Sequence, residues 1–320
     1  MSEAPPGVIA PSGSDGAWPR LFVGPQGLRA GWSLLVYIAA GLLVEGGIGW
    51  IVSRFWRSPR EAPWTPGLLV AGEAAFFAIA LLLTLFMGRI ERRGLADYGF
   101  PLRRAFGARF WEGSGWGLAS CALVYVLMAA GGGYSVHGLA VSGVAALRWA
   151  LLWALAMLGI AVYEEFYFRG FPLFTLTRGL GFWPAALILS LYFGGIHYFE
   201  KPHESWLDFL NVGLIGLFFC FTVRRTGDVW FATGWHFAFN FLSMGVMGSP
   251  NSGNQGGKPL TGHLLQGSFR GPDWLTGGPT GAQASVFTLA MVAVLFLLFH
   301  LRHRQARYPA TARAVLPSTS

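Results

Sequence analysis

The sequence has few charged residues for its length. Charged residues make up 12% of its 320 residues, whereas soluble domains carry roughly 25%. Hydrophobic residues make up 53%, and the mean hydropathy is +0.48. This composition excludes a soluble globular protein and predicts an all-α, polytopic integral membrane protein.

Cysteine is also scarce. Cys121 and Cys220 are the two that occur, and both fall inside predicted membrane spans. They exclude a disulfide framework and a cysteine-based zinc site. The N-terminus lacks the basic-then-apolar order of a cleaved signal peptide. Residues 1–28, which begin polar and rich in Pro, Gly and Ser, are instead predicted to form a disordered arm.

Eight apolar stretches approach the length of about 20 residues that a membrane-spanning helix needs. They lie at residues 31–53, 67–88, 113–132, 144–166, 183–199, 206–223, 229–247 and 284–301. The predicted organisation is a single transmembrane domain over residues 29–303, followed by a cytoplasmic tail over 304–320. Residues 248–283 are rich in Gly, Pro, Asn and Ser and are expected to form a long, partly disordered external loop.

The net charge of +8 predicts membrane orientation rather than nucleic-acid binding, because the basic residues lie in short loops between apolar runs. Residues 1–30, the 89–109 and 167–182 loops, residues 224–225 and residues 302–320 hold 16 of the 23 basic residues. Arg54, Arg57 and Arg60 lie in an alternate loop and oppose this trend. We therefore expect both termini in the cytoplasm, with the chain in a bacterial cell membrane.

Two adjacent carboxylates, Glu164 and Glu165, end the fourth predicted span. Ionisable groups at such a place are unfavourable unless they are paired or hydrated. Glu165 and Arg169 are four residues apart and therefore share one helix face. Glu164 lies about 100° around the helix and has no basic residue three or four positions on. The spacing predicts one glutamate held by the arginine and one free for chemistry.

Polar residues also occur in two later spans. His197 ends the fifth span, four residues after Phe193. His236 and Asn240 lie inside the seventh span, four residues apart and therefore on one face. These positions predict a buried polar cavity between the helices.

Together these side chains have the chemistry that peptide-bond hydrolysis needs. A carboxylate with an assisting imidazole can take a proton from water. His236 and Asn240 could then hold the oxyanion of the tetrahedral intermediate. Alternatively, Glu164, His197 and His236 could bind a zinc ion with an open water position. Asn240 is a poor zinc ligand, which favours activation of water without a metal.

The three motifs are Glu164-Glu165-x-x-x-Arg169, Phe193-x-x-x-His197 and His236-x-x-x-Asn240. In this order they resemble the motifs of the CAAX protease and bacteriocin-processing family of intramembrane proteases, which includes the type II CAAX prenyl endopeptidases. The matching core covers about residues 160–245. Many members are classed as metalloproteases, although a glutamate mechanism without metal has also been argued for the family.

The resemblance implies a role for each motif residue. Glu164 would activate the attacking water with help from His197, and His236 with Asn240 would hold the oxyanion. Structural support would come from the remaining motif residues, Glu165, Arg169 and Phe193. The implied partner is a membrane-associated protein or peptide, lipidated or not, processed either at a CAAX-type terminus or in bacteriocin maturation and immunity. The oligomeric state is not predicted.

Glu164 and His197 are predicted to lie at different depths in the membrane. His197 lies roughly 20 Å along its span at 1.5 Å per residue, whereas Glu164 is near the cytoplasmic end of the fourth span. We therefore expect the fourth helix to continue to about Phe174. The site would then lie in a water-filled cavity open to the cytoplasm.

Two other functions fit part of the pattern. Glu45 and Glu73, single carboxylates in the first and second spans, could join Glu164 and Glu165 in a proton-coupled transporter. An inert membrane scaffold could also keep the fold. Internal repeats, which transporters often have, are not evident in this sequence. The presence of every motif residue favours a protease over a scaffold.

Overall fold

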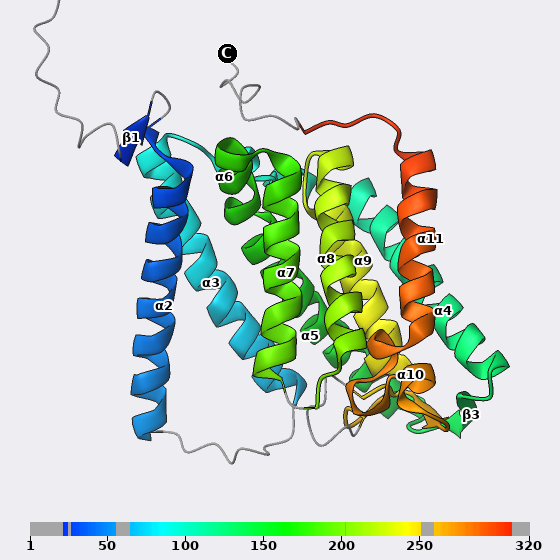
Figure 1. Cartoon of the computed structure of the whole chain (residues 1–320). Coiled ribbons are helices and arrows are strands. Elements are labelled where there is room, and N and C mark those ends of the chain that lie inside the picture. The colour runs from blue at the N-terminus through cyan, green and yellow to red at the C-terminus, as the bar shows by residue number, and fades with distance from the viewer. Residues whose placement is uncertain (1–21, 25–26, 56–64, 202, 251–258, 309–320) are drawn as a thin grey trace, which may run out of the picture.

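The computed structural model describes residues 22–24, 27–55, 65–201, 203–250 and 259–308. Long helices run side by side between two ends of the molecule (Figure 1). Six helices are long and apolar enough to cross a membrane within the described part of the chain. They are α2 (Ala30–Phe55), α3 (Pro66–Glu91), α4 (Ala108–Ala130), α5 (Gly143–Arg169), α7 (Phe182–Glu200) and α8 (Trp206–Thr226). The all-α membrane fold is thereby confirmed.

The seventh and eighth expected spans form shorter helices. The seventh is α9 (Trp230–Asn240), continued by the π-helical segment η3 (Phe241–Val246). The eighth is α11 (Val286–Arg302), which has 17 residues. All eight expected stretches are thus largely helical, and six of them meet the length of a full membrane span.

Hydroxyl side chains begin three of these helices. The side-chain oxygens of Thr65, Ser205 and Ser285 accept hydrogen bonds from backbone N–H groups in the first turns of α3, α8 and α11. Such caps satisfy donors that have no partner within the helix. Gly227 ends α8 with a φ of 86°, a left-handed conformation that glycine adopts readily.

The expectation that the fourth helix continues to Phe174 is wrong in its detail. Helix α5 ends at Arg169, and a separate helix, α6 (Phe171–Leu180), follows Gly170. Pro172 explains the break, because inside a helix its ring would clash with the carbonyl four residues earlier. At the start of α6 the same proline is tolerated. Because α6 follows α5, Glu164 still lies well before the end of the helical segment 143–180.

Helices α4 and α9 pack closely through glycines. A Cβ atom on Gly113 would lie 2.1 Å from the carbonyl oxygen of Phe231, and one on Gly117 would lie 2.3 Å from that of Trp235. On the opposing helix, a Cβ on Gly234 would lie 2.0 Å from the carbonyl oxygen of Phe110. Small residues allow such backbone approach in membrane proteins. This contact fixes α9, the helix that carries His236.

We call the end of the bundle that carries the start of α2 and the end of α11 the termini end, and the opposite end the loop end (Figure 1). The loop end contains two strands, β3 (Tyr134–Leu139) and β4 (Leu265–Phe269), paired antiparallel, and the short helix α10 (Asp273–Thr276). The connecting segments also form short 3₁₀ turns: η1 (Leu95–Tyr98), η2 (Leu102–Arg104), η5 (Gly278–Thr280) and η6 (Ala282–Ala284).

Two segments that were expected to be disordered contain regular structure. In the loop expected over 248–283, Leu260 and Leu275 are buried, and this apolar anchoring explains why much of it folds. In the N-terminal arm, β1 (Val23–Gly24) pairs with β2 (Gly27–Leu28). Residues 1–21 of the arm, 251–258 of the loop and 309–320 of the tail lie outside the described residues.

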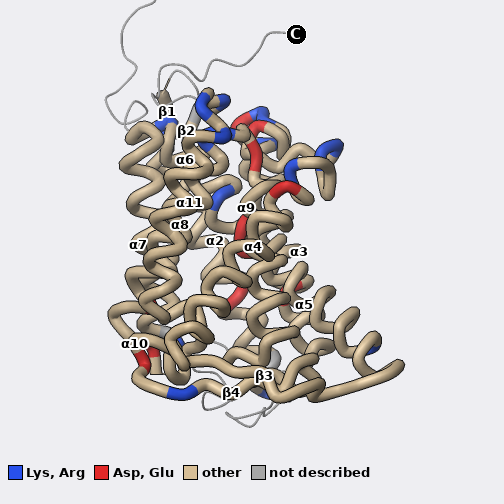
Figure 2. The backbone as a smooth tube through the Cα atoms, turned by 90° about the vertical axis from the view of Figure 1, so that its right-hand side faces the viewer, with Lys and Arg blue, Asp and Glu red and all other residues tan. Residues whose placement is uncertain are grey.

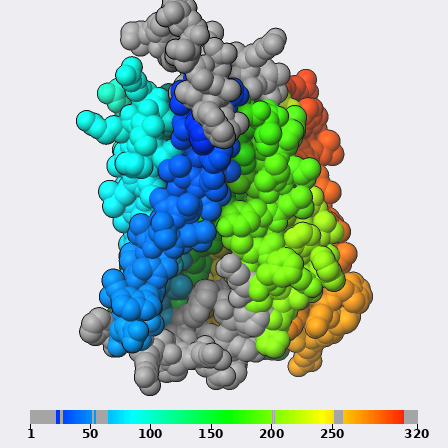
Figure 3. All heavy atoms as spheres, turned by 60° about the vertical axis from the view of Figure 1, so that its left-hand side comes forward, coloured from blue at the N-terminus to red at the C-terminus, as the bar shows by residue number. Residues whose placement is uncertain are grey.

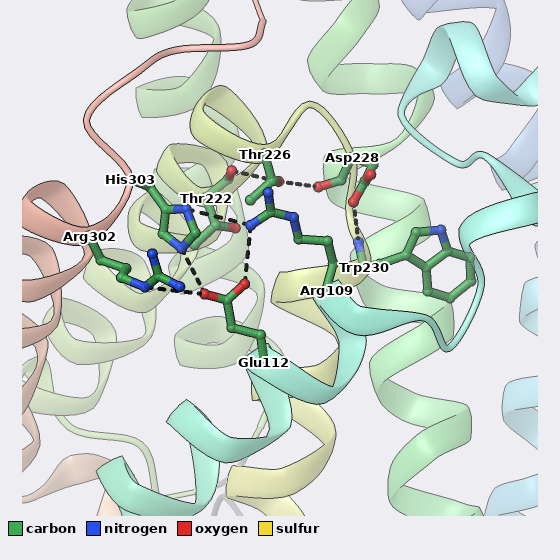
Figure 4. Close-up of polar contacts among 8 residues, drawn as sticks. All are labelled: Arg109, Glu112, Thr222, Thr226, Asp228, Trp230, Arg302 and His303. Atoms are coloured by element: carbon green, nitrogen blue, oxygen red, sulfur yellow. Dashed lines mark hydrogen bonds and ion pairs between the residues drawn. The ribbon is translucent and has the colours of Figure 1, made fainter.

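A polar cluster joins α4 and α11 at the termini end (Figure 4). Glu112 of α4 accepts hydrogen bonds from Nη1 of Arg109 at 3.1 Å and from Nε2 of His303 at 3.0 Å. Arg302, at the end of α11, lies 4.0 Å from the same carboxylate. Burial lowers the pKa of His303, although the neighbouring Glu112 opposes this shift. The cluster attaches the end of α11 to the start of α4.

Candidate active site

A cavity of about 230 Å³ lies among α3, α5, α7, α8 and α9. All four residues predicted to be catalytic line it, namely Glu164, His197, His236 and Asn240. One water needs roughly 10–15 Å³, so the cavity has room for several. Most of the remaining wall is apolar: Ile160, Phe193, Val212, Ile215, Phe219, Trp235, Phe239 and Met244. Apolar walls lower the local dielectric and strengthen interactions between the polar groups.

Glu165 and Arg169 form the ion pair that their spacing predicts. Nη1 of Arg169 donates to Oε1 of Glu165 at 3.2 Å, and both side chains are buried. The guanidinium also lies over the ring of Phe193, 4.3 Å from its centroid. Gly216 of α8 makes room for it, since a Cβ there would lie 2.8 Å from Nη2 of Arg169. The pair therefore joins α5 to α7 and α8.

His236 lies between the two adjacent glutamates. Its Nδ1 contacts Oε1 of Glu165 at 3.0 Å, and its Nε2 lies 3.9 Å from Oε2 of Glu164. The imidazole also stacks on Phe219, with ring centroids 5.6 Å apart. A carboxylate can only accept, so Nδ1 of His236 carries the proton of this hydrogen bond. Glu165 thus fixes the orientation of the imidazole, and Nε2 faces Glu164.

Glu164 is the more accessible of the two glutamates. Its side chain is 20% exposed and lines the cavity, whereas that of Glu165 is 0% exposed. The difference follows from the 100° step between neighbours on a helix. Glu165 faces Arg169 inside the protein, and Glu164 faces the open space.

His197 reaches the same cavity from the end of α7. Its Nδ1 donates to the carbonyl oxygen of Phe193 at 2.9 Å, which leaves Nε2 as an acceptor in the neutral ring. The rings of Phe193 and His197 lie 4.6 Å apart, so Phe193 contacts both this imidazole and the guanidinium of Arg169. The residue predicted to give support thus connects the first and second motifs.

Three polar residues of the cavity were not assigned to the site from the sequence. Glu73 of α3 lines it, and Gly159 of α5 allows the close approach, since a Cβ there would lie 3.4 Å from that of Glu73. Lys201, four residues after His197, could have been found from that helical spacing. Gln283 of η6 could not, because it comes from an irregular segment far along the chain.

The candidate zinc ligands do not form a preformed metal set. Within the described residues, no three His, Cys, Asp or Glu side chains are gathered as a metal-binding group. Nε2 of His236 lies 3.9 Å from Oε2 of Glu164. Ligand atoms about 2.0–2.2 Å from a shared ion would lie closer together than this.

The cavity does not open toward the end that was expected. Lys201 follows the last turn of α7, and Gln283 lies just before α11 begins, so both cavity residues are at the loop end. In the space-filling view the molecule is hollowed between α2 and α7 in this half (Figure 3). The expectation of an opening on the side of the termini is wrong, because aromatic side chains fill that half of the bundle. Phe100 lies 4.7 Å from both Phe166 and Trp230, measured between ring centroids.

Part of the chain matches a known protein family. Residues 146–242 match the family described as type II CAAX prenyl endopeptidase Rce1-like. The matched segment begins in α5, ends in η3 and contains all three motifs. No curated protein and no solved structure matches the chain. The match confirms the resemblance that the motifs indicated, and at family level it indicates a membrane-embedded protease.

Proposed function

On the premise that its motif-bearing segment belongs to the CAAX protease and bacteriocin-processing family, we propose that this chain is an intramembrane endopeptidase. It hydrolyses a peptide bond of a membrane-associated protein or peptide, with water as the nucleophile. The observation that supports this most directly is the position of Glu164. Its carboxylate lines a cavity, 3.9 Å from an imidazole that a second, buried glutamate holds in place.

Glu164 acts as the general base. It takes a proton from a water in the cavity, and the resulting hydroxide attacks the carbonyl carbon of the substrate. Such proton transfer contributes typically about 10²–10⁴-fold to a rate. His197 assists, because its Nδ1 is bonded to the Phe193 carbonyl and its Nε2 can accept a hydrogen bond from the same water. The leaving amine then receives the proton that Glu164 holds.

The oxyanion of the tetrahedral intermediate is held by His236 and Asn240. Both line the cavity, and they share one face of α9 because they are four residues apart. Nδ1 of His236 is already bonded to Glu165, so its donor to the oxyanion is Nε2 in the protonated ring. Glu165 and Arg169 position this imidazole without contacting the substrate.

The experiment that tests the function compares membranes from cells that express the parent chain or Glu164→Gln. We expect one or more precursor peptides to accumulate in the variant, identified by sequencing the protein termini in each membrane. Glu45→Gln is the matched control, because Glu45 is a carboxylate of α2 that does not line the cavity. Identical sets of termini in parent and Glu164→Gln membranes would overturn the proposal.

A further inference from the structure

The cavity communicates with one end of the bundle. Its lining includes Lys201 and Gln283 at the loop end, and Glu73, which lies in the third turn of α3 from that end. His197 is three residues before the end of α7, which places it about 5 Å from the loop end at 1.5 Å per residue. The reacting groups are therefore reached from the loop end.

The half of the bundle between the site and the termini end is closed by packed aromatic side chains. Phe166 and Phe171 are 0% exposed and Trp230 is 2% exposed. The guanidinium of Arg169, which follows Glu165 by one turn, is enclosed by the rings of Phe193 and Phe219 at 4.3 and 5.2 Å. A peptide could not pass this layer without a large rearrangement of packed aromatic side chains.

The basic residues show the opposite distribution. Most Lys and Arg residues gather at the termini end (Figure 2), and the stretch from residue 89 to residue 109 alone contains six arginines. Among the described residues, the loop end has Arg54, Arg148, Lys201 and Arg270. Loops enriched in Lys and Arg remain on the cytoplasmic side of a membrane. The termini end is therefore the cytoplasmic end, and the loop end faces the other compartment.

Resting on the proposed function, we propose that the catalytic cavity is entered from the extracytoplasmic side. The substrate is then an outward-facing peptide segment: part of a translocated peptide, or of a membrane protein that emerges from the outer face. A cytoplasmic C-terminus, whether lipidated or not, would meet the closed aromatic half of the bundle. The two-stranded sheet of β3 and β4 lies at the loop end, as do the cavity residues Lys201 and Gln283.

Added cysteines test the orientation directly. Both natural cysteines are 0% exposed, so they do not react with a reagent in solution. The variants are Leu139→Cys in β3 at the loop end, where the leucine is 65% exposed, Gln283→Cys in the cavity wall, and Arg304→Cys at the termini end. Intact cells are treated with a membrane-impermeant maleimide, and labelling is compared with that after permeabilisation.

We expect Leu139→Cys and Gln283→Cys to label in intact cells, and Arg304→Cys to label only after permeabilisation. The reverse pattern would overturn the proposal. Labelling of Leu139→Cys without Gln283→Cys in intact cells would also overturn it, because the cavity would then be closed from outside. Trp274→Cys replaces Leu139→Cys if that variant does not fold, since this residue of α10 is 58% exposed. Lys201→Cys, which also lies in the cavity wall, replaces Gln283→Cys for the same reason.

The labelling does not depend on catalysis, so the same measurement in the Glu164→Gln background should give the same pattern. The two proposals can therefore fail separately. Accumulated precursors with cytoplasmic cleavage sites would refute the orientation and leave the protease intact. Outside labelling with no accumulated precursor would refute the protease and leave the orientation intact.

Discussion

Replacement of Arg169 by Met tests whether the buried ion pair holds the site together. The side chains of Arg169 and Glu165 are 1% and 0% exposed, and their charged atoms are 3.2 Å apart. Removing one member of a buried pair costs about 3–5 kcal/mol, because the other charge stays buried without its partner. His236 still contacts Glu165, so we expect the lower end of that range, about 3 kcal/mol.

The assay is thermal unfolding of the purified protein in detergent, followed by tryptophan fluorescence at one fixed scan rate. A loss of this size lowers the midpoint by roughly 5–10 °C. Arg148→Met is the matched control, because it is the same substitution at an exposed position of the same helix. Substitutions at such positions change stability by about 0.5 kcal/mol or less.

The double variant Glu165→Gln/Arg169→Met completes the test. Removing both charges also removes the cost of burying them, so the midpoint should recover most of the way to that of the parent. The amide oxygen of the introduced glutamine can still accept the hydrogen bond from His236. The reasoning is refuted if Arg169→Met unfolds within about 1 °C of Arg148→Met, a difference of about 0.5 kcal/mol or less, or if the double variant is less stable than the single one.

Three further predictions concern other residues. Asn240→Ala should lower kcat by about 10²–10³-fold with little change in KM, as expected for loss of an oxyanion donor, and an unchanged kcat would exclude that role. Burial and the neighbouring Asp208 raise the pKa of Glu204 to about 9, so the folded protein holds a proton there that the unfolded chain releases at lower pH. Protonated Glu204 therefore stabilises the folded protein at acid pH, and this contribution is lost as the pH rises toward 9. Unfolding midpoints of Glu204→Gln should therefore fall less than those of the parent between about pH 6 and pH 9, and parallel curves would contradict this. Glu112→Gln should weaken the contact with His303, lower the midpoint by about 2–4 °C for roughly 1 kcal/mol, and speed hydrogen exchange at the end of α11, whereas unchanged exchange would refute the anchoring role.

The sequence was sufficient to predict the fold class and four of the polar residues that line the cavity, Glu164, His197, His236 and Asn240. Periodicity explains this success, because Glu165 with Arg169, and His236 with Asn240, each lie four residues apart on one helix. The apolar runs likewise predicted where the long helices lie. These features depend on spacing within one helix, which can be read from the sequence without knowing how the helices pack.

Features that depend on packing between distant segments were missed or wrong. The break at Gly170 follows from Pro172, yet the depth argument extended the helix through it. Gln283 reaches the cavity from a segment whose composition indicates only a loop. The direction in which the cavity opens depends on aromatic side chains from several segments and on the end of α7, and no single stretch of sequence carries that information.

The central claim is that Glu164 activates water for peptide hydrolysis. It is tested most directly with a precursor that accumulates in Glu164→Gln membranes, incubated with purified parent or variant protein in ¹⁸O-labelled water. The account predicts that the parent product carries one ¹⁸O atom in its new carboxylate, and that Glu164→Gln lowers kcat by about 10²–10⁴-fold while Glu45→Gln does not. Turnover by Glu164→Gln within about tenfold of the parent would contradict it.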